Sequence, residues 1–250
     1  MQIILIAGPK GGTGKSTFAT NLSVMNCYMN KDTLLMDIDS RGSTTSSDFI
    51  NERLDKSLKF TPHCIQLAGR YIGREIENFS KKFDIIVVDA GGYDSVELRS
   101  AMSCELVNEV FIPLRPGKAD IGTLSKMNEV IEKAKVYNES MIGKIILNQC
   151  RSVGKQIALH NSIAYIEKLE YMQIMKTRIF NRIAFEYALE DSLIVVESEK
   201  RDMQAMKKYQ LEKYIPKASL EMKELYLEIT NEEFFIEDSL WAKILIKMTL

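Results

Sequence analysis

Short apolar runs alternate with longer stretches of helical periodicity along most of the chain. The runs are nearly continuous, and they cover residues 3–7, 33–37, 64–67, 84–89, 109–113, 144–148 and 173–177. Such runs are typical of strands that are buried on both faces of a parallel sheet. Stretches with helical spacing lie between them, for example at residues 16–29, 70–79, 96–104, 121–137 and 155–169. The pattern therefore predicts a doubly wound α/β fold, a mostly parallel sheet flanked by helices.

Neither an internal repeat nor a low-complexity linker divides the chain. We expect residues 1–218 to form one domain. Residues 219–250 hold three basic and seven acidic side chains, and we expect them to be an acidic C-terminal extension that docks on this domain. In a doubly wound sheet, ligands bind at the carboxyl ends of the strands, so the candidate chemistry is sought there.

Composition limits the classes of function. The 250 residues are 46% hydrophobic and 27% charged, with a formal net charge of −1, which excludes a bulk polycation. Any contact with nucleic acid would therefore need a local basic patch. The four cysteines are scattered without a C-x-x-C spacing, so neither a disulfide framework nor a zinc site is indicated. Without a signal-peptide pattern or a long apolar run, the sequence predicts a cytoplasmic protein with reduced thiols.

A glycine-rich segment follows the first apolar run and precedes the first helical stretch. Residues 8–17 read GPKGGTGKST and match G-x-x-x-x-G-K-S/T, in the strand-before and helix-after context that this phosphate-binding motif requires. Glycines let backbone N–H groups wrap around phosphates, and the positive end of the following helix dipole points at them. The segment predicts a nucleotide site in which Lys15 contacts the β- and γ-phosphates and the Ser16 hydroxyl binds Mg²⁺. The residues expected to hold the nucleotide are Gly11, Gly12, Thr13, Gly14, Lys15, Ser16 and Thr17.

Carboxylates follow two further strands. Asp37 and Asp39 stand two residues apart at the end of the run at 33–37, so both point toward the phosphate side. An aspartate pair that only caps the next turn is the alternative interpretation. The run at 84–89 ends in Asp89, the Walker B arrangement, which predicts that this carboxylate holds Mg²⁺ through water. Residues 90–95 then supply a flexible loop beside the γ-phosphate, in which Asp94 is a candidate helix N-cap.

A second lysine makes the phosphate loop more informative. With Lys10 the segment reads KGGTGKS, which resembles the deviant Walker A signature of the ParA/MinD family of P-loop ATPases. The resemblance implies a homodimer that sandwiches two ATP molecules, in which Lys10 reaches the partner's nucleotide. Residues 37–43, DIDSRGS, resemble the family's D-x-D-P-Q-G-N element, which implies that Asp39 positions the attacking water. Ser40 and Arg41 replace the usual Pro-Gln.

Further matches run in order from residue 3 to about residue 210. Residues 89–99, DAGGYDSVELR, are similar to D-T-A-G-R-D-S-x-E-L-R of plasmid-partition ParA proteins, with Tyr93 in place of arginine. Residues 112–120 resemble a P-x-x-P-S-x-x-D loop, and residues 177–197 resemble another ParA segment. Residues 144–151, KIILNQCR, resemble the family strand whose asparagine reads adenine. The resemblance therefore makes Asn148 the base-contact candidate, unless it only caps a turn.

The resemblance implies a partition ATPase. It is expected to bind nonspecific DNA as an ATP dimer and to release it on Mg²⁺-dependent hydrolysis, stimulated by a centromere-binding partner protein. It would then associate with the nucleoid. Because the phosphate loop begins at residue 8, we expect no N-terminal domain that reads an operator sequence. The candidate DNA-binding residues are Lys155, Lys168, Lys176, Arg178, Arg182, Lys200, Arg201, Lys207 and Lys208.

Two alternatives stay open. Residues 239–250 could form an amphipathic helix that anchors a MinD-like ATPase to membrane, with Trp241, Lys243 and Lys247 at the interface. The acidic residues before it, among them Glu232 and Glu233, would repel anionic lipid and argue against this anchor. A non-hydrolysing, ATP-sensing adaptor would share every motif. A metal-cluster reductase of the same fold is disfavoured, because Cys104 and Cys150 lack the expected pairing.

Overall fold

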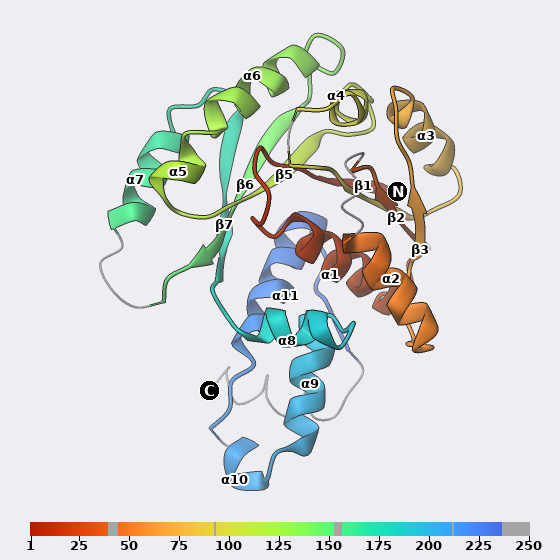
Figure 1. Cartoon of the computed structure of the whole chain (residues 1–250), viewed down its shortest axis with the longest axis vertical. Coiled ribbons are helices and arrows are strands. Elements are labelled where there is room, and N and C mark those ends of the chain that lie inside the picture. The colour runs from red at the N-terminus through yellow and green to blue at the C-terminus, as the bar shows by residue number, and fades with distance from the viewer. Residues whose placement is uncertain (40–44, 93, 153–156, 212, 237–250) are drawn as a thin grey trace.

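A computed structural model of the protein describes residues 1–39, 45–92, 94–152, 157–211 and 213–236. Its sheet has seven strands in the order β3-β2-β4-β1-β5-β6-β7, and every pair of neighbours is parallel (Figure 1). The predicted doubly wound α/β fold is confirmed. The strands are β1 (Gln2–Ile6), β2 (Thr33–Asp37), β3 (His63–Gln66), β4 (Ile85–Asp89), β5 (Glu109–Leu114), β6 (Ile142–Cys150) and β7 (Met172–Phe180).

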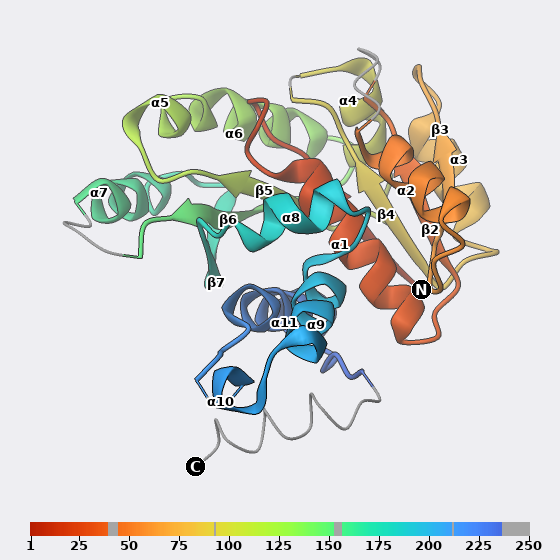
Figure 2. The same cartoon turned by 60° about the horizontal axis from the view of Figure 1, so that its bottom comes forward.

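Helices cover both faces of this sheet. The helices are α1 (Lys15–Tyr28), α2 (Thr45–Asp55), α3 (Ile72–Phe79), α4 (Val96–Met102), α5 (Lys118–Ile121), α6 (Leu124–Ala134), α7 (Ile157–Ile166), α8 (Ala184–Glu190), α9 (Val195–Ala205), α10 (Lys208–Leu211) and α11 (Lys217–Thr230). One apolar core lies under α3, α4, α6 and α7, and a second lies under α1, α2, α9 and α11. Figure 2 shows α5 and α6 on one side of β5 and β6, with α9 and α11 on the other. Two buried faces explain why the strands are continuous apolar runs.

The helix predicted over residues 121–137 is present but shorter, because it begins only at Leu124 and ends at Ala134. The chain forms α5 and α6 there, separated by Gly122 and Thr123. The Thr123 amide donates to the Asp120 carbonyl three residues back, and the Thr123 hydroxyl donates to the same carbonyl at 2.6 Å. These bonds tighten the turn at Gly122 and end α5, because they compete with the i to i−4 pattern of an α-helix.

Helix α11 completes the second core. Met222, Leu225 and Tyr226 are fully buried against β7 and α9, and the Tyr226 hydroxyl donates to Asn26 Oδ1 of α1 at 2.8 Å. The boundary expected after residue 218 falls inside this helix. Residues 237–250, where the amphipathic membrane anchor was considered, lie outside the described residues.

The topology brings the strand ends together around β1. The chain moves outward from β1 to β2 and β3 on one side, and later through β5, β6 and β7 on the other. Asp37 and Asp89 are register partners on the adjacent strands β2 and β4, and Ile6, at the end of β1, is level with Asp89. This reversal of strand order is where a doubly wound sheet forms a ligand crevice.

Candidate nucleotide-binding site

The phosphate-binding loop joins β1 to α1 and depends on two glycines with left-handed backbones. Gly12 has φ of 72° and Gly14 has φ of 99°, a conformation that residues with a Cβ rarely adopt. A Cβ on Gly14 would lie 2.4 Å from Asn148 Nδ2, so the loop also needs a glycine there for space. Helix α1 begins at Lys15, and its first amide groups face the loop as an anion site.

Lys15 and Lys10, the two lysines of the phosphate-binding loop, have side chains directed to different parts of the molecule. The buried Lys15 Nζ donates to the Lys10 carbonyl at 3.0 Å, inside the loop. Burial lowers the pKa of Lys15, and the nearby charges of Asp89 and Asp39 act against this shift. Both carboxylates therefore lie close enough to feel the Lys15 ammonium group.

Lys10, by contrast, reaches out of its own loop to Asp120, where α5 begins. Its Nζ donates to Asp120 Oδ1, and Arg115 Nε donates to Asp120 Oδ2 at 3.0 Å. Although burial raises the pKa of Asp120, the hydrogen bonds from Lys10 and Arg115 hold it below its usual value. The Lys10 side chain stays 38% exposed, which leaves its amine accessible to a group outside the chain.

The carboxylates Asp37 and Asp89 meet two hydroxyl groups from the start of α2. Ser47 Oγ donates to Asp37 Oδ2 at 3.1 Å, and the Ser46 and Ser16 hydroxyls lie near Asp89. Asp89 is buried, and its Oδ1 has no hydrogen-bond partner among the residues that the structure describes. Burial and the neighbouring Asp37 raise the pKa of Asp89 to about 6, although Ser16, Ser46 and Lys15 act against the shift.

This arrangement fits the Mg²⁺ expected at Ser16 and Asp89. A buried carboxylate oxygen without a partner has the chemistry of a hard-cation ligand, and it lies beside the Ser16 hydroxyl. Magnesium in nucleotide sites is bound by few protein groups together with phosphates and waters, so this small set of ligands is sufficient.

Asp39, the expected water-positioning residue, is half-buried just after β2. Its amide donates to Asp37 Oδ1 at 3.2 Å, which links the two acids. Its charge acts on Lys15, so it lies on the phosphate side of the site. Ser40 and Arg41, which replace the usual Pro-Gln, lie outside the described residues.

The loop after β4 packs directly on the phosphate-binding loop. A Cβ on Gly92 would lie 3.1 Å from the Gly11 nitrogen and from the Lys10 carbonyl carbon. The N-cap of α4 is Ser95, whose Oγ accepts from the Leu98 amide at 3.1 Å. The suggestion that Asp94 is the cap is therefore wrong, because the Asp94 carboxylate pairs instead with the Arg99 guanidinium. Tyr93 lies outside the described residues.

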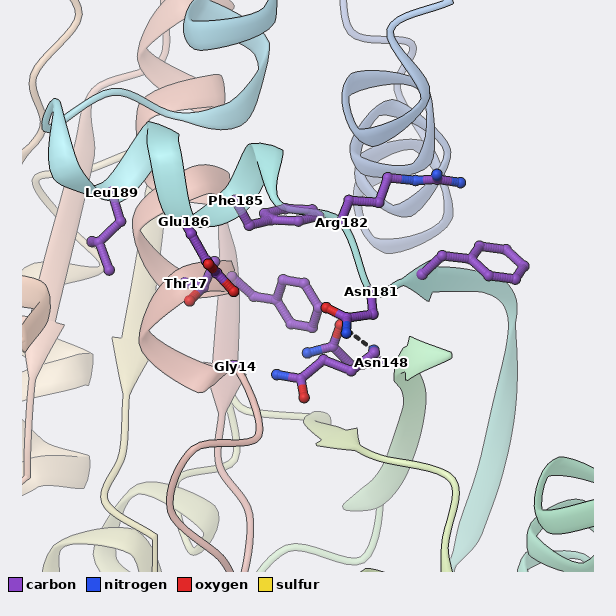
Figure 3. A pocket seen from close by; sticks show the side chains of 11 residues that line it. Gly14, Thr17, Asn148, Asn181, Arg182, Phe185, Glu186 and Leu189 are labelled. Carbon is purple, nitrogen blue, oxygen red and sulfur yellow. Dashed lines mark hydrogen bonds between the residues drawn. The ribbon is translucent and has the colours of Figure 1, made fainter. Parts of the chain in front are cut away.

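A pocket beside Gly14 and Thr17 extends the site toward α8 (Figure 3). Asn148 lies at its base, where Nδ2 donates to the Thr13 carbonyl at 2.7 Å and Oδ1 accepts from the Gln149 amide at 2.8 Å. Asn148 thus fixes the end of the phosphate-binding loop. Phe185 and Glu186 form the opposite wall, and Figure 3 shows the Glu186 carboxylate directed toward Thr17.

These two wall residues, like Ser46 and Ser47, are parts of the site that sequence reasoning missed. The match over residues 177–197 had included them, but it gave them no role. Their position depends on α8 crossing the start of α1, a contact between segments more than 160 residues apart. The signal that could have pointed to the pocket wall was an aromatic residue, Phe185, followed by an acid, Glu186, inside a segment that resembles the family.

The comparison with known families decides the relationship. The domain family described as CobQ/CobB/MinD/ParA nucleotide binding domain matches residues 4–192, most of the chain. The chain belongs to this family. The predicted ParA/MinD resemblance is therefore confirmed.

The individual proteins that match this chain share only limited sequence identity with it. The sporulation initiation inhibitor protein Soj of Bacillus subtilis strain 168 is 29% identical over 123 residues, a match to 35% of this chain and 49% of Soj. The chain thus spans about half the length of that relative. An ATP complex of a Cyanothece McdA variant superposes with a TM-score of 0.70 at 13% identity, over 95% of this chain and 99% of that one. The Pyrococcus horikoshii OT3 MinD, with Mg-ADP, gives 0.63 at 17% identity, over 92% and 96%.

The basic residues expected to contact DNA lie on several elements of this family fold. Lys168 follows α7, Lys176 and Arg178 lie on the edge strand β7, and Lys207 separates α9 from α10, all four exposed. Arg182 pairs with Glu221, and Arg201 pairs with Asp191, so part of the charge is neutralised within the chain. Lys155 and the Lys208 side chain lie outside the described residues.

Within the residues that the structure describes, every helix is too short or too polar to cross a lipid bilayer.

Proposed function

We propose that this protein is a ParA-like ATPase whose nucleotide cycle controls dimerisation and attachment to DNA. The observation that carries the proposal is the divergence of the two loop lysines: Lys15 serves its own loop, whereas Lys10 projects out of it. Within its own chain this second lysine pairs with Asp120 and not with the phosphate-binding loop. Its partly exposed side chain suits the phosphates of a second copy once the amine leaves Asp120.

The surrounding side chains supply the groups that phosphoryl transfer needs. Lys15 contacts the β- and γ-phosphates, Ser16 and Asp89 hold Mg²⁺, and Asp39 orients the attacking water. Mg²⁺ held by Ser16 and Asp89 would neutralise part of the negative charge on the phosphates. Positioning and charge stabilisation dominate this chemistry, so an aspartate without unusual basicity suffices as the orienting residue.

ATP favours the sandwich dimer in this proposal, and hydrolysis returns the monomers as a population shift. Dimerisation doubles the number of exposed lysines and arginines that can contact DNA phosphates, which need no base reading. A centromere-binding partner protein would stimulate hydrolysis and release the DNA. The relatives support ATP as the nucleotide, because the McdA variant was solved with ATP and the MinD with Mg-ADP.

Two substitutions separate the steps of the cycle. Lys15→Ala removes the main phosphate contact, so we expect it to abolish productive ATP binding. Asp39→Ala keeps the phosphate contacts and loses water positioning, so we expect it to bind ATP and remain a long-lived dimer. Labelled-ATP hydrolysis in a single turnover and light scattering measure the two properties. Hydrolysis by Asp39→Ala at the parent rate would contradict the role of Asp39.

The attachment surface is tested by cosedimentation. Purified protein is pelleted with nonspecific duplex DNA or with anionic liposomes, with ADP or with ATP, at low and moderate salt. We expect ATP-dependent, salt-sensitive pelleting with DNA alone, because phosphate contacts weaken as salt rises. Pelleting with liposomes, lost when residues 240–250 are deleted, would instead identify a membrane-anchored ATPase. Binding to neither would indicate an ATP switch that attaches to another protein.

A further inference from the structure

A groove lies between α3, α4 and the segment that follows α6, outside the nucleotide site. It is lined among others by Arg70, Arg74, Val96, Arg99 and Tyr137. The three arginines are exposed, and Arg99 is held by Asp94. Figure 1 shows α3 and α4 as adjacent helices at one end of the sheet, away from α9 and α10.

The groove combines positive charge with exposed apolar side chains. Val96 is 58% exposed and Tyr137 is 71% exposed, and Tyr71, which stacks against Arg70, is 57% exposed. Arginine and tyrosine are enriched at the energetic centres of protein interfaces, where aromatic side chains and guanidinium groups are desolvated together. This composition is typical of a surface that binds a protein segment.

The floor of the groove is fixed before any partner arrives. Helices α3 and α4 touch at Gly73, where a Cβ would lie only 2.6 Å from the Ser100 carbonyl oxygen. Ser100 Oγ accepts from the Gly73 amide at 3.0 Å and donates to the Arg70 carbonyl at 2.8 Å. A rigid floor lowers the entropic cost of binding, because the helices need no ordering.

The same helix connects the groove to the phosphate-binding loop. Helix α4 begins at the Ser95 cap, directly after the loop whose Gly92 packs against Lys10 and Gly11. The Asp94–Arg99 ion pair joins that loop to the groove wall. A partner carboxylate that takes Arg99 from Asp94 would therefore alter the contacts of the loop beside the phosphates.

We propose that this groove binds an acidic peptide segment of a partner protein, with at least one apolar side chain set between Val96 and Tyr137. Charge complementarity carries the choice of occupant: among the lining residues Arg70 and Arg74 outnumber the acid Glu77, and Arg99 adds its charge once it leaves Asp94. A nucleic-acid strand is disfavoured for two reasons. Glu77 and Asp94 interrupt the positive charge, and the exposed side chains of Val96 and Tyr137 offer no cation for a phosphate. The consequence of peptide binding for the loop beside the phosphates rests on the proposed ATPase cycle. Binding of the peptide in the groove does not depend on that cycle.

Fluorescence anisotropy with defined probes tests the binding. The probes are a random copolymer of glutamate and tyrosine, polyglutamate, and a short duplex DNA, each added to full-length wild type, Arg74→Glu and Lys213→Glu. Lys213→Glu is the matched control, since it makes the same charge reversal at an exposed site between α10 and α11. Arg74 is exposed on α3, so its substitution leaves folding and basal hydrolysis intact.

We expect the copolymer to bind wild type more tightly than polyglutamate does, and Arg74→Glu to weaken that binding about tenfold. Lys213→Glu should change the copolymer affinity by less than about threefold, as for a screened surface charge. Equal binding by wild type and Arg74→Glu would overturn the proposal. So would polyglutamate binding as tightly as the copolymer, or an Arg74→Glu effect confined to DNA.

Hydrogen exchange separates this inference from the proposed cycle. With the copolymer bound, amide exchange over residues 90–102 should change in wild type and stay unchanged in Arg74→Glu. The measurement needs no ATP, so its result does not depend on whether the protein hydrolyses ATP. Groove binding without any change over residues 90–102 would overturn the link to the phosphate-binding loop.

Discussion

At the scale of single residues, the site concentrates groups whose ionisation depends on burial. Asp89 is enclosed between Ser16, Ser46 and Asp37, and its pKa rises to about 6 because the buried carboxylate resists ionisation. Lys15 experiences the opposite shift, since burial disfavours its ammonium form. Burial disfavours the charged form of both groups, and in the proposed function a magnesium nucleotide supplies each with a charged partner.

Asp89→Asn should make the nucleotide-free protein more stable at neutral pH. Because the pKa of Asp89 is raised in the folded state, this state still holds a proton between about pH 4 and pH 6, where the unfolded state has already released it. Wild-type stability therefore falls as pH rises through that window. Above it, the variant should exceed wild type by up to ~3 kcal/mol, and the difference should shrink toward pH 4. Urea unfolding across this pH range measures it.

The matched control is Asp55→Asn, an exposed carboxylate at the end of α2. It should leave the free energy of unfolding within ~0.5 kcal/mol of wild type at all these values. An Asp89→Asn variant less stable than wild type at neutral pH would show that the buried carboxylate does not destabilise the folded protein. In the same variant, ATP affinity should no longer respond to Mg²⁺.

At the scale of elements, a buried ion pair ties α2 to α9. The Arg53 side chain is fully buried, and its guanidinium donates two bonds to Glu197, at 2.6 and 2.9 Å, and one to the Ser192 carbonyl. Tyr28 of α1 also donates to Glu197. Three helices therefore meet at one carboxylate, next to α8, which forms a wall of the pocket at Gly14.

Arg53→Met should destabilise the protein by ~3–5 kcal/mol, because it leaves the Glu197 carboxylate without its cation in a largely buried place. Arg201→Met is the matched control on α9: Arg201 pairs with Asp191, but its side chain is 48% exposed, so the cost should stay below ~1 kcal/mol. Chemical denaturation measures both. Similar losses for the two variants would show that the buried pair contributes no more than the exposed one.

At the scale of the whole molecule, the proposed dimer depends on a lysine that is ion-paired within its own chain. Lys10 and Arg115 both donate to Asp120, but only Lys10 belongs to the phosphate-binding loop. A dimer that uses Lys10 must first release it from Asp120. The ion pair thus opposes the dimer until phosphates compete for the lysine.

Lys10→Ala should bind ATP with nearly wild-type affinity and fail to dimerise, because in the proposed dimer the lysine acts on the partner's nucleotide. The measurement is light scattering with ATP, in an Asp39→Ala background that keeps the dimer from turning over. Arg115→Ala is the control, since it removes the other cation on Asp120 and should leave the ATP dimer in place. A normal ATP dimer from Lys10→Ala would remove its proposed role.

The sequence by itself determined the layered fold and the phosphate edge of the site. Seven apolar runs marked the seven strands of the described sheet. The central strands were the clearest, because burial on both faces leaves few polar positions in them, whereas the edge strands β3 and β7 keep exposed polar residues. The phosphate loop could be recognised from residues 8–17, since its chemistry needs glycines, a lysine and a hydroxyl that are contiguous in the chain. Asp37 and Asp89 each ended an apolar run, which placed them at the same edge of the sheet.

Only the tertiary structure decided the contacts between distant segments. The break at Gly122, the Ser46 and Ser47 hydroxyls at the carboxylates, and the α8 wall of the pocket depend on which surfaces pack together. Lys10 and Asp120 were both visible in the sequence, but their pairing required the topology that sets β1 beside β5. Helices and strands can be predicted because neighbouring residues in the sequence determine them. Contacts in a site that packing assembles depend instead on how distant segments come together in the whole fold.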